Sequence, residues 1–105
     1  MKLIVFDYDG TLNARPVSKI FTAYKKAGFI VGVMSRAMLR GDNAKRMLNS
    51  GADFVCGAGG KDKIPRLQEL GKGFTKRIYV GDLKIDIKRA RESGFLYQKP
   101  PRKVC

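Results

Sequence analysis

The chain has 105 residues, of which 44% are hydrophobic, and this suits one small globular domain. Lysine and arginine outnumber aspartate and glutamate by 22 to 9, so the formal net charge is +13. No apolar run approaches the length of a membrane span, the N-terminus lacks a secretory-signal pattern, and two cysteines make no disulfide framework. These features argue against a membrane protein or a disulfide-rich secreted one, and we expect a cytoplasmic protein.

Short apolar runs alternate with amphipathic segments along the chain. We expect strands over 2–6, 29–34, 53–56, 77–80 and 95–97, and helices near 17–27, 42–49, 62–70 and 85–93. This alternation predicts a parallel sheet with helices on both faces. The expected fold is a three-layer, Rossmann-like α/β domain over residues 1–97, with about five strands, followed by an extended basic tail over 98–105.

The segment Asp7-Tyr8-Asp9-Gly10-Thr11, which directly follows the first strand, is the most informative in the chain. Side chains two residues apart on an extended segment share a face, so Asp7 and Asp9 should point into one cleft and Tyr8 should pack on the other side. In open α/β sheets, ligands bind beyond the carboxyl ends of the strands. Two close carboxylates repel each other unless a cation lies between them, and oxygen ligands favour magnesium. The alternative is an ordinary turn, because aspartate and glycine are common turn residues.

A second acidic pair follows the fourth expected strand. Asp82 comes directly after Gly81, and Asp86 lies one helical turn further on, so both carboxylates can face the same point. Each aspartate alone could be a helix cap or a first-turn acid. That explanation is weaker when Asp7 and Asp9 end another strand of the same sheet.

Two less specific signals lie between the acidic pairs. Ser35 ends the second strand and precedes Arg36, and its hydroxyl could bind phosphate oxygens, although a serine there is commonly a turn or cap residue. Lys63 opens the third helix, where a cation opposes the helix dipole; this suggests a role in neutralising a phosphate or a carboxylate cluster. Lys61 is an equal candidate from the sequence alone, and either lysine could simply be solvated.

Together these segments resemble the four motifs of the haloacid dehalogenase superfamily of phosphohydrolases, in order and over nearly the whole chain. The resemblance matches Asp7–Thr11 to a DxDGT motif, Ser35 to the serine or threonine that ends strand two, and Gly81 through Asp86 to GDxxxD. Lys63 fits the third-motif lysine best, with Lys61 as its rival. Most members carry a cap domain, but the connections after Thr11 and over 57–61 are too short for one. The resemblance therefore implies a minimal, capless member with an open site.

What the resemblance implies is a magnesium-dependent phosphatase that works through an aspartyl-phosphate. Asp7 is then the nucleophile, Asp9 the acid and base, and Lys63 the third catalytic residue. The implied magnesium ligands are Asp7, the backbone carbonyl of Asp9, Asp82 and Asp86, with Asp86 acting directly or through water. The implied phosphate contacts are Gly10, Thr11, Ser35, Arg36 and Lys63.

The charge bears on the substrate and the partners. Only five acidic residues lie outside the two acidic pairs, so the surface should attract polyanions. Bases expected near the site are Arg15, Arg36, Arg40, Lys61 and Lys84. An open basic site favours phosphorylated nucleic-acid ends or nucleotides. Two alternatives stay open: a homo-oligomeric phosphatase for small metabolites such as sugar phosphates, and a nucleic-acid-binding module with vestigial catalytic residues.

Overall fold

Five parallel strands form one sheet in the computed structural model, which describes residues 1–9, 11–12, 16–39 and 41–100. The strand order is β3-β2-β1-β4-β5. The strands are β1 (Lys2–Asp7), β2 (Phe29–Ser35), β3 (Phe54–Gly57), β4 (Lys76–Val80) and β5 (Leu96–Gln98). The helices are α1 (Val17–Lys26), α2 (Gly41–Asn49), α3 (Lys63–Leu70) and α4 (Lys84–Ser93), with a 3-10 turn, η1 (Arg36–Leu39), after β2. None of the described helices has the length and apolarity that crossing a bilayer requires.

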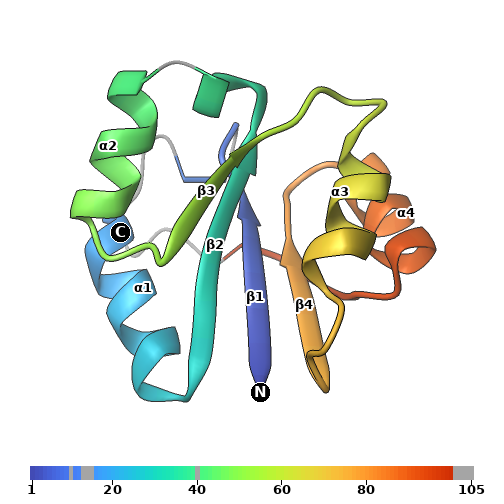
Figure 1. Ribbon diagram of the computed structural model, residues 1–105, viewed down its shortest axis with the longest axis horizontal. Helices are drawn as coiled ribbons and strands as arrows, with labels where there is room; N and C mark the ends of the chain where they lie inside the picture. The colour runs from blue at the N-terminus through green and yellow to red at the C-terminus, as the bar shows by residue number, and fades with distance from the viewer. Residues whose placement is uncertain (10, 13–15, 40, 101–105) are drawn as a thin grey trace.

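Helices cover both faces of the sheet, α1 and α2 on one face and α3 and α4 on the other (Figure 1). Side chains alternate along the central strand β1: Ile4 and Phe6 pack with α1 and α2, whereas Leu3 and Val5 pack with α3 and α4. All four side chains are fully buried, because a central parallel strand is covered on both sides. The same alternation directs Asp7 to the α3/α4 face and Tyr8 to the α1/α2 face.

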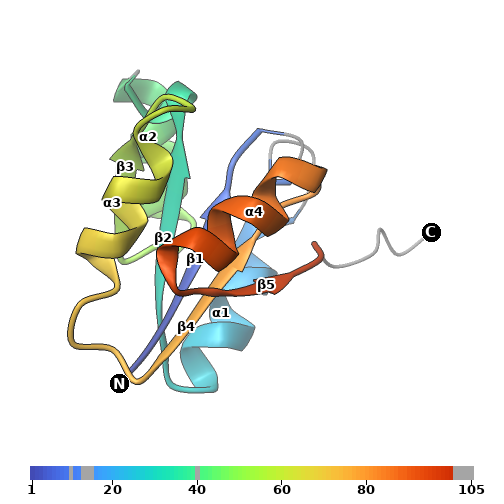
Figure 2. The ribbon, with the colours of Figure 1, turned by 90° about the vertical axis from the view of Figure 1, so that its right-hand side faces the viewer.

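The last strand closes one edge of the sheet. Figure 2 shows β5 beside β4, with α4 on one side of the sheet and α1 on the other. Gly94 ends α4 in a left-handed conformation, at a φ of 83°, and the Phe95 N–H then bonds the Ala90 carbonyl at 2.8 Å. This helix end is typical of a glycine cap, and it delays the start of β5 until Leu96.

The α/β class, the parallel sheet of five strands and the placement of helices on both faces are confirmed, and the arrangement is compatible with a Rossmann-like fold. Each expected boundary differs from the observed one by at most one residue. Asp53, expected in β3, lies just before it, because its carboxylate accepts a hydrogen bond from the Val31 N–H at 2.8 Å. Gln98, expected in the tail, belongs to β5, and residues 101–105 lie outside the described residues.

Candidate functional site

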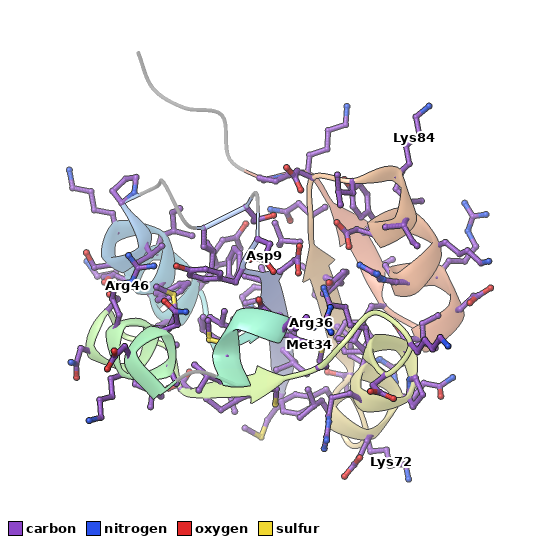
Figure 3. All side chains as sticks on the ribbon, turned by 90° about the horizontal axis from the view of Figure 1, so that it is seen from above. Asp9, Met34, Arg36, Arg46, Lys72 and Lys84 are labelled. Carbon is purple, nitrogen blue, oxygen red and sulfur yellow. The ribbon has the colours of Figure 1, made fainter. Side chains whose placement is uncertain are left out.

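The predicted site residues gather at the carboxyl ends of the strands. Asp7 ends β1 and pairs in register with Met34 of β2, whose next residue is Ser35. On the other side of β1, Phe6 pairs with Val80, the last residue of β4. Figure 3 views this edge from above, with Asp9 and Arg36 near its middle and Lys84 further out on α4. The parallel pairing therefore brings three strand ends of distant sequence position to one place.

A buried ion pair lies at the centre of this edge. The Lys63 Nζ donates to Asp7 Oδ1 at 2.8 Å, and the two residues are only 7% and 2% exposed. Burial raises the pKa of Asp7 to about 6; Lys63 opposes this rise, while Asp86 and Asp9 add to it. Lys63 reaches Asp7 because it is the first residue of α3 and points to the same side of that helix as the buried Leu67. Lys61 lies before the helix and is exposed, so the structure pairs Asp7 with Lys63.

A second buried carboxylate, Asp86, organises the loop after β4. Its Oδ2 accepts a hydrogen bond from the Leu83 N–H at 3.1 Å, and its Oδ1 accepts one from Arg89 at 3.1 Å. A Cβ at Gly81 would lie only 2.3 Å from Asp86 Oδ2, so this position has no room for a side chain. The glycine of the Gly81-Asp82 pair thus lets Asp86 pack against the loop that carries Asp82.

Three carboxylates are close enough to share one cation. Asp7, Asp82 and Asp86 each offer an oxygen, and these oxygens lie within 4.8 Å of one another. A set of hard oxygen donors fits magnesium, since magnesium prefers carboxylates and water to nitrogen or sulfur ligands. Asp86 already accepts hydrogen bonds on both oxygens, whereas Asp82 is exposed and can turn toward a cation.

Asp9 and Ser35 meet across the gap between β1 and β2. The Ser35 hydroxyl donates to Asp9 Oδ2 at 2.8 Å, which holds the exposed Asp9 carboxylate beside the end of β2. Asp9 is not in the group of carboxylates that share a cation position, so the side chains of the first acidic pair have different surroundings. The phosphate contact expected of Ser35 stays a prediction.

The remaining predicted residues differ in how far they are buried. Thr11 is fully buried, and its Oγ1 has no hydrogen-bond partner among the described residues. Arg36 is exposed at the start of η1, and Lys84 is exposed at the start of α4. Gly10, Arg15 and Arg40 lie outside the described residues. Tyr8, expected to face away from the carboxylates, is confirmed in the core on the α1/α2 face.

Two positioning residues were missed by sequence reasoning. The Tyr97 hydroxyl, from β5, donates to the Gly81 carbonyl at 2.6 Å and so holds the loop that carries Asp82. Arg89, whose side chain is 13% exposed, pairs with Asp86. A helical spacing of three residues could have suggested the Arg89 contact, but no sequence pattern links Tyr97 to a loop 16 residues earlier.

No protein-family model matches this chain, and no curated protein matches it either.

Proposed function

We propose that this protein is a magnesium-dependent phosphatase that hydrolyses phosphomonoesters through an aspartyl-phosphate intermediate. The observation that carries the proposal is the buried Asp7–Lys63 pair at the end of β1, with oxygens of Asp82 and Asp86 close by. A nucleophilic carboxylate must be oriented, and the hydrogen bond from Lys63 to Oδ1 orients this one. The motif resemblance to haloacid dehalogenase phosphohydrolases, with their α/β core, supports the same assignment.

In the proposed reaction Asp7 attacks the phosphorus in line, and the bond from phosphorus to the alcohol oxygen breaks. Asp9 gives a proton to that leaving oxygen, and then accepts a proton from the water that attacks the acyl-phosphate. Phosphate leaves and the Asp7 carboxylate is restored. Lys63 offsets negative charge on Asp7 and on the phosphoryl oxygens throughout.

Magnesium, when bound by Asp7 and Asp82 with Asp86 adjoining, would supply positive charge against the phosphoryl oxygens. The residues fit such an ion by donor type and by spacing. Exposed Arg36 and Lys84 at the same edge suit a substrate with further negative charge, such as a phosphorylated nucleic-acid end or a nucleotide.

Hydrolysis of para-nitrophenyl phosphate, with and without magnesium, tests the proposal. We expect magnesium-dependent release by the wild type and a loss of at least about 1000-fold in Asp7→Asn, because the nucleophile is removed while the shape is kept. Asp42→Asn is a matched control: it makes the same change at an exposed position in the first turn of α2 and should keep activity. Equal turnover by Asp7→Asn and wild type would overturn the proposal.

A further inference from the structure

The positive charge of this chain is unevenly distributed along the sequence. All nine acidic residues lie either before residue 10 or after residue 41, so the segment 10–41 contains none. Within that segment, α1 carries Lys19, Lys25 and Lys26 without any acidic residue. Among the described helices, α1 is therefore the one that contains basic residues and no acidic residue.

The helices on the opposite face of the sheet have their cations largely paired. Arg66 lies 3.7 Å from Glu69 in α3, and Lys88 lies 4.0 Å from Glu92 in α4. On α1, Lys25 pairs with Asp53 at 3.3 Å, but Lys19 and Lys26 have no carboxylate partner among the described residues. Their positive charges are exposed to solvent and free to meet an external anion.

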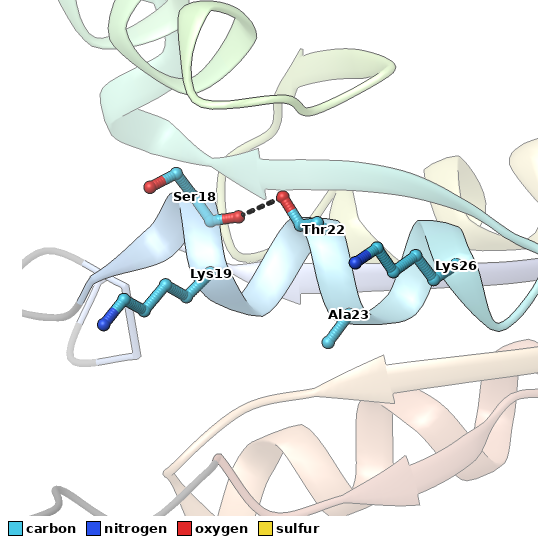
Figure 4. A pocket seen from close by; sticks show the side chains of 5 residues that line it. All are labelled: Ser18, Lys19, Thr22, Ala23 and Lys26. Carbon is cyan, nitrogen blue, oxygen red and sulfur yellow. Dashed lines mark hydrogen bonds between the residues drawn. The ribbon is translucent and has the colours of Figure 1, made fainter.

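A shallow groove of about 390 Å³ runs over the same part of α1. Its lining combines two lysines with two hydroxyl side chains and one alanine: Ser18, Lys19, Thr22, Ala23 and Lys26 (Figure 4). Lys19 and Lys26 are two helical turns apart, about 10 Å along the axis. That separation spans about three phosphates of a nucleic-acid strand with a rise of 3.4 Å each.

We propose that the outer face of α1 binds the phosphodiester backbone of a nucleic acid, through Lys19 and Lys26. No aromatic side chain lines the groove, so the contact should read charge and not base sequence. The C-terminal end of β5 reaches α1, because the Gln98 side chain contacts the Tyr24 hydroxyl, and the exposed Lys99 follows Gln98 in the chain.

This surface is separate from the carboxylate cluster and does not depend on the proposed hydrolysis. Helix α1 connects the parallel strands β1 and β2 and so runs back along the sheet, which places its first residue, Val17, toward the edge where β1 ends. A polymer held along α1 could thus present a phosphorylated end to that edge.

Fluorescence anisotropy with labelled single-stranded oligonucleotides tests the proposal. We would use Asp7→Asn protein with a chelator, so that hydrolysis cannot consume the probe, and a deoxyribo- and a ribo-oligonucleotide of one sequence. The test variant is Lys19→Gln/Lys26→Gln, and the control is Lys72→Gln/Lys88→Gln. Each removes two exposed charges, but the control lysines lie after α3 and on α4.

We expect binding that weakens as salt is added. In the α1 variant, the slope of log affinity against log salt should become shallower by about 1.4, because two phosphate contacts on a single strand are lost. The slope of the control variant should change much less.

Similar affinity for the two probes supports recognition of the backbone. If one probe binds more tightly and the α1 variant loses that preference, DNA or RNA is identified as the partner. Equal weakening by the two double variants, or no binding by the parent protein at low salt, would overturn the proposal.

Hydrolysis of para-nitrophenyl phosphate by the α1 variant in the wild-type background should be unchanged, which separates this surface from the catalytic site.

Discussion

The two faces of the sheet differ in whether they bury charged side chains. On the α1/α2 face, none of the described charged side chains is buried: Arg46 contacts the Tyr8 hydroxyl from the exposed side, and the cations of α1 lie outside in solvent. On the α3/α4 face, Asp7, Lys63 and Asp86 are buried beside the apolar core. Burying charge costs free energy, and even a paired buried charge is often no more stable than apolar side chains of similar volume, so a face that buries three of them is organised for something besides stability.

The central strand shows how one short sequence serves both faces. Successive side chains of β1 point to opposite faces, so Phe6 lies in the apolar cluster and Asp7 lies in the charged one. Phe6 is held by ring contacts with Phe21 and Tyr24, at centroid distances of 5.6 Å. Asp7 is held by a directed ion pair. Substitutions on the two faces should therefore have different effects on stability and activity, and the following predictions use that difference.

The largest effect on stability is expected on the apolar face. Phe6→Ala should lower the free energy of unfolding by about 3–5 kcal/mol, because a fully buried aromatic ring is replaced by a cavity. Urea denaturation measures the loss. Phe6→Leu, which keeps much of the volume, should cost roughly 1.5 kcal/mol or less. A loss below 1 kcal/mol for Phe6→Ala, on the order of a surface change, would show that this face is not the packed core described here.

Removing one charge on the other face should damage both stability and activity. Lys63→Met leaves Asp7 buried without its partner, and we expect a loss of about 3–5 kcal/mol near neutral pH together with loss of phosphatase activity. The double variant Asp7→Asn/Lys63→Met should recover most of the stability and none of the activity, since no buried charge is left unpaired. If the double variant is no more stable than Lys63→Met, the unpaired Asp7 charge is not what destabilises Lys63→Met.

The pH dependence of stability should differ between wild type and Asp7→Asn in metal-free protein. The pKa of Asp7 is raised from 3.8 to about 6 in the folded state, so the folded state binds more protons than the unfolded chain in that range. The contribution of Asp7 to stability is therefore full below about pH 4 and is lost as pH rises through 6, a change of about 1–3 kcal/mol. Thermal unfolding with a chelator from pH 4 to 7 measures it. Asp7→Asn should lack this fall, and identical profiles for the two proteins would contradict the assigned burial.

The smallest expected effect concerns the support of the Asp82 loop. Tyr97→Phe removes the hydrogen bond to the Gly81 carbonyl. We expect the free energy of unfolding to fall by about 1 kcal/mol and the magnesium affinity to weaken by up to about tenfold. Magnesium dependence of the rate measures the second effect. Tyr24→Phe, which removes a hydroxyl that contacts Gln98, should leave the magnesium dependence unchanged. Equal effects of the two variants would show that Tyr97 is merely structural.

Much of the fold was predictable, because hydrophobic runs and glycine boundaries are local signals. The carboxylate cluster was also predictable, since strand ends of a parallel sheet meet at one edge and Asp7, Asp82 and Asp86 follow such ends. The choice between Lys61 and Lys63 needed the start of α3, which differs by one residue from the expected one and directs Lys63 inward. The Ser35–Asp9 bond and the Tyr97 contact depend on single hydrogen bonds between distant segments, which leave no periodic trace in a sequence.

The proposed mechanism requires that Asp7 carries the phosphoryl group. The most direct test is mass analysis of acid-quenched protein during turnover of a phosphomonoester with magnesium, with the modified peptide mapped. We expect one phosphoryl group on Asp7 that depends on magnesium, is absent from Asp7→Asn and increases in Asp9→Asn, where the water-activating carboxylate is lost. Turnover that leaves Asp7 unmodified in both wild type and Asp9→Asn, and that persists in Asp7→Asn, would contradict it.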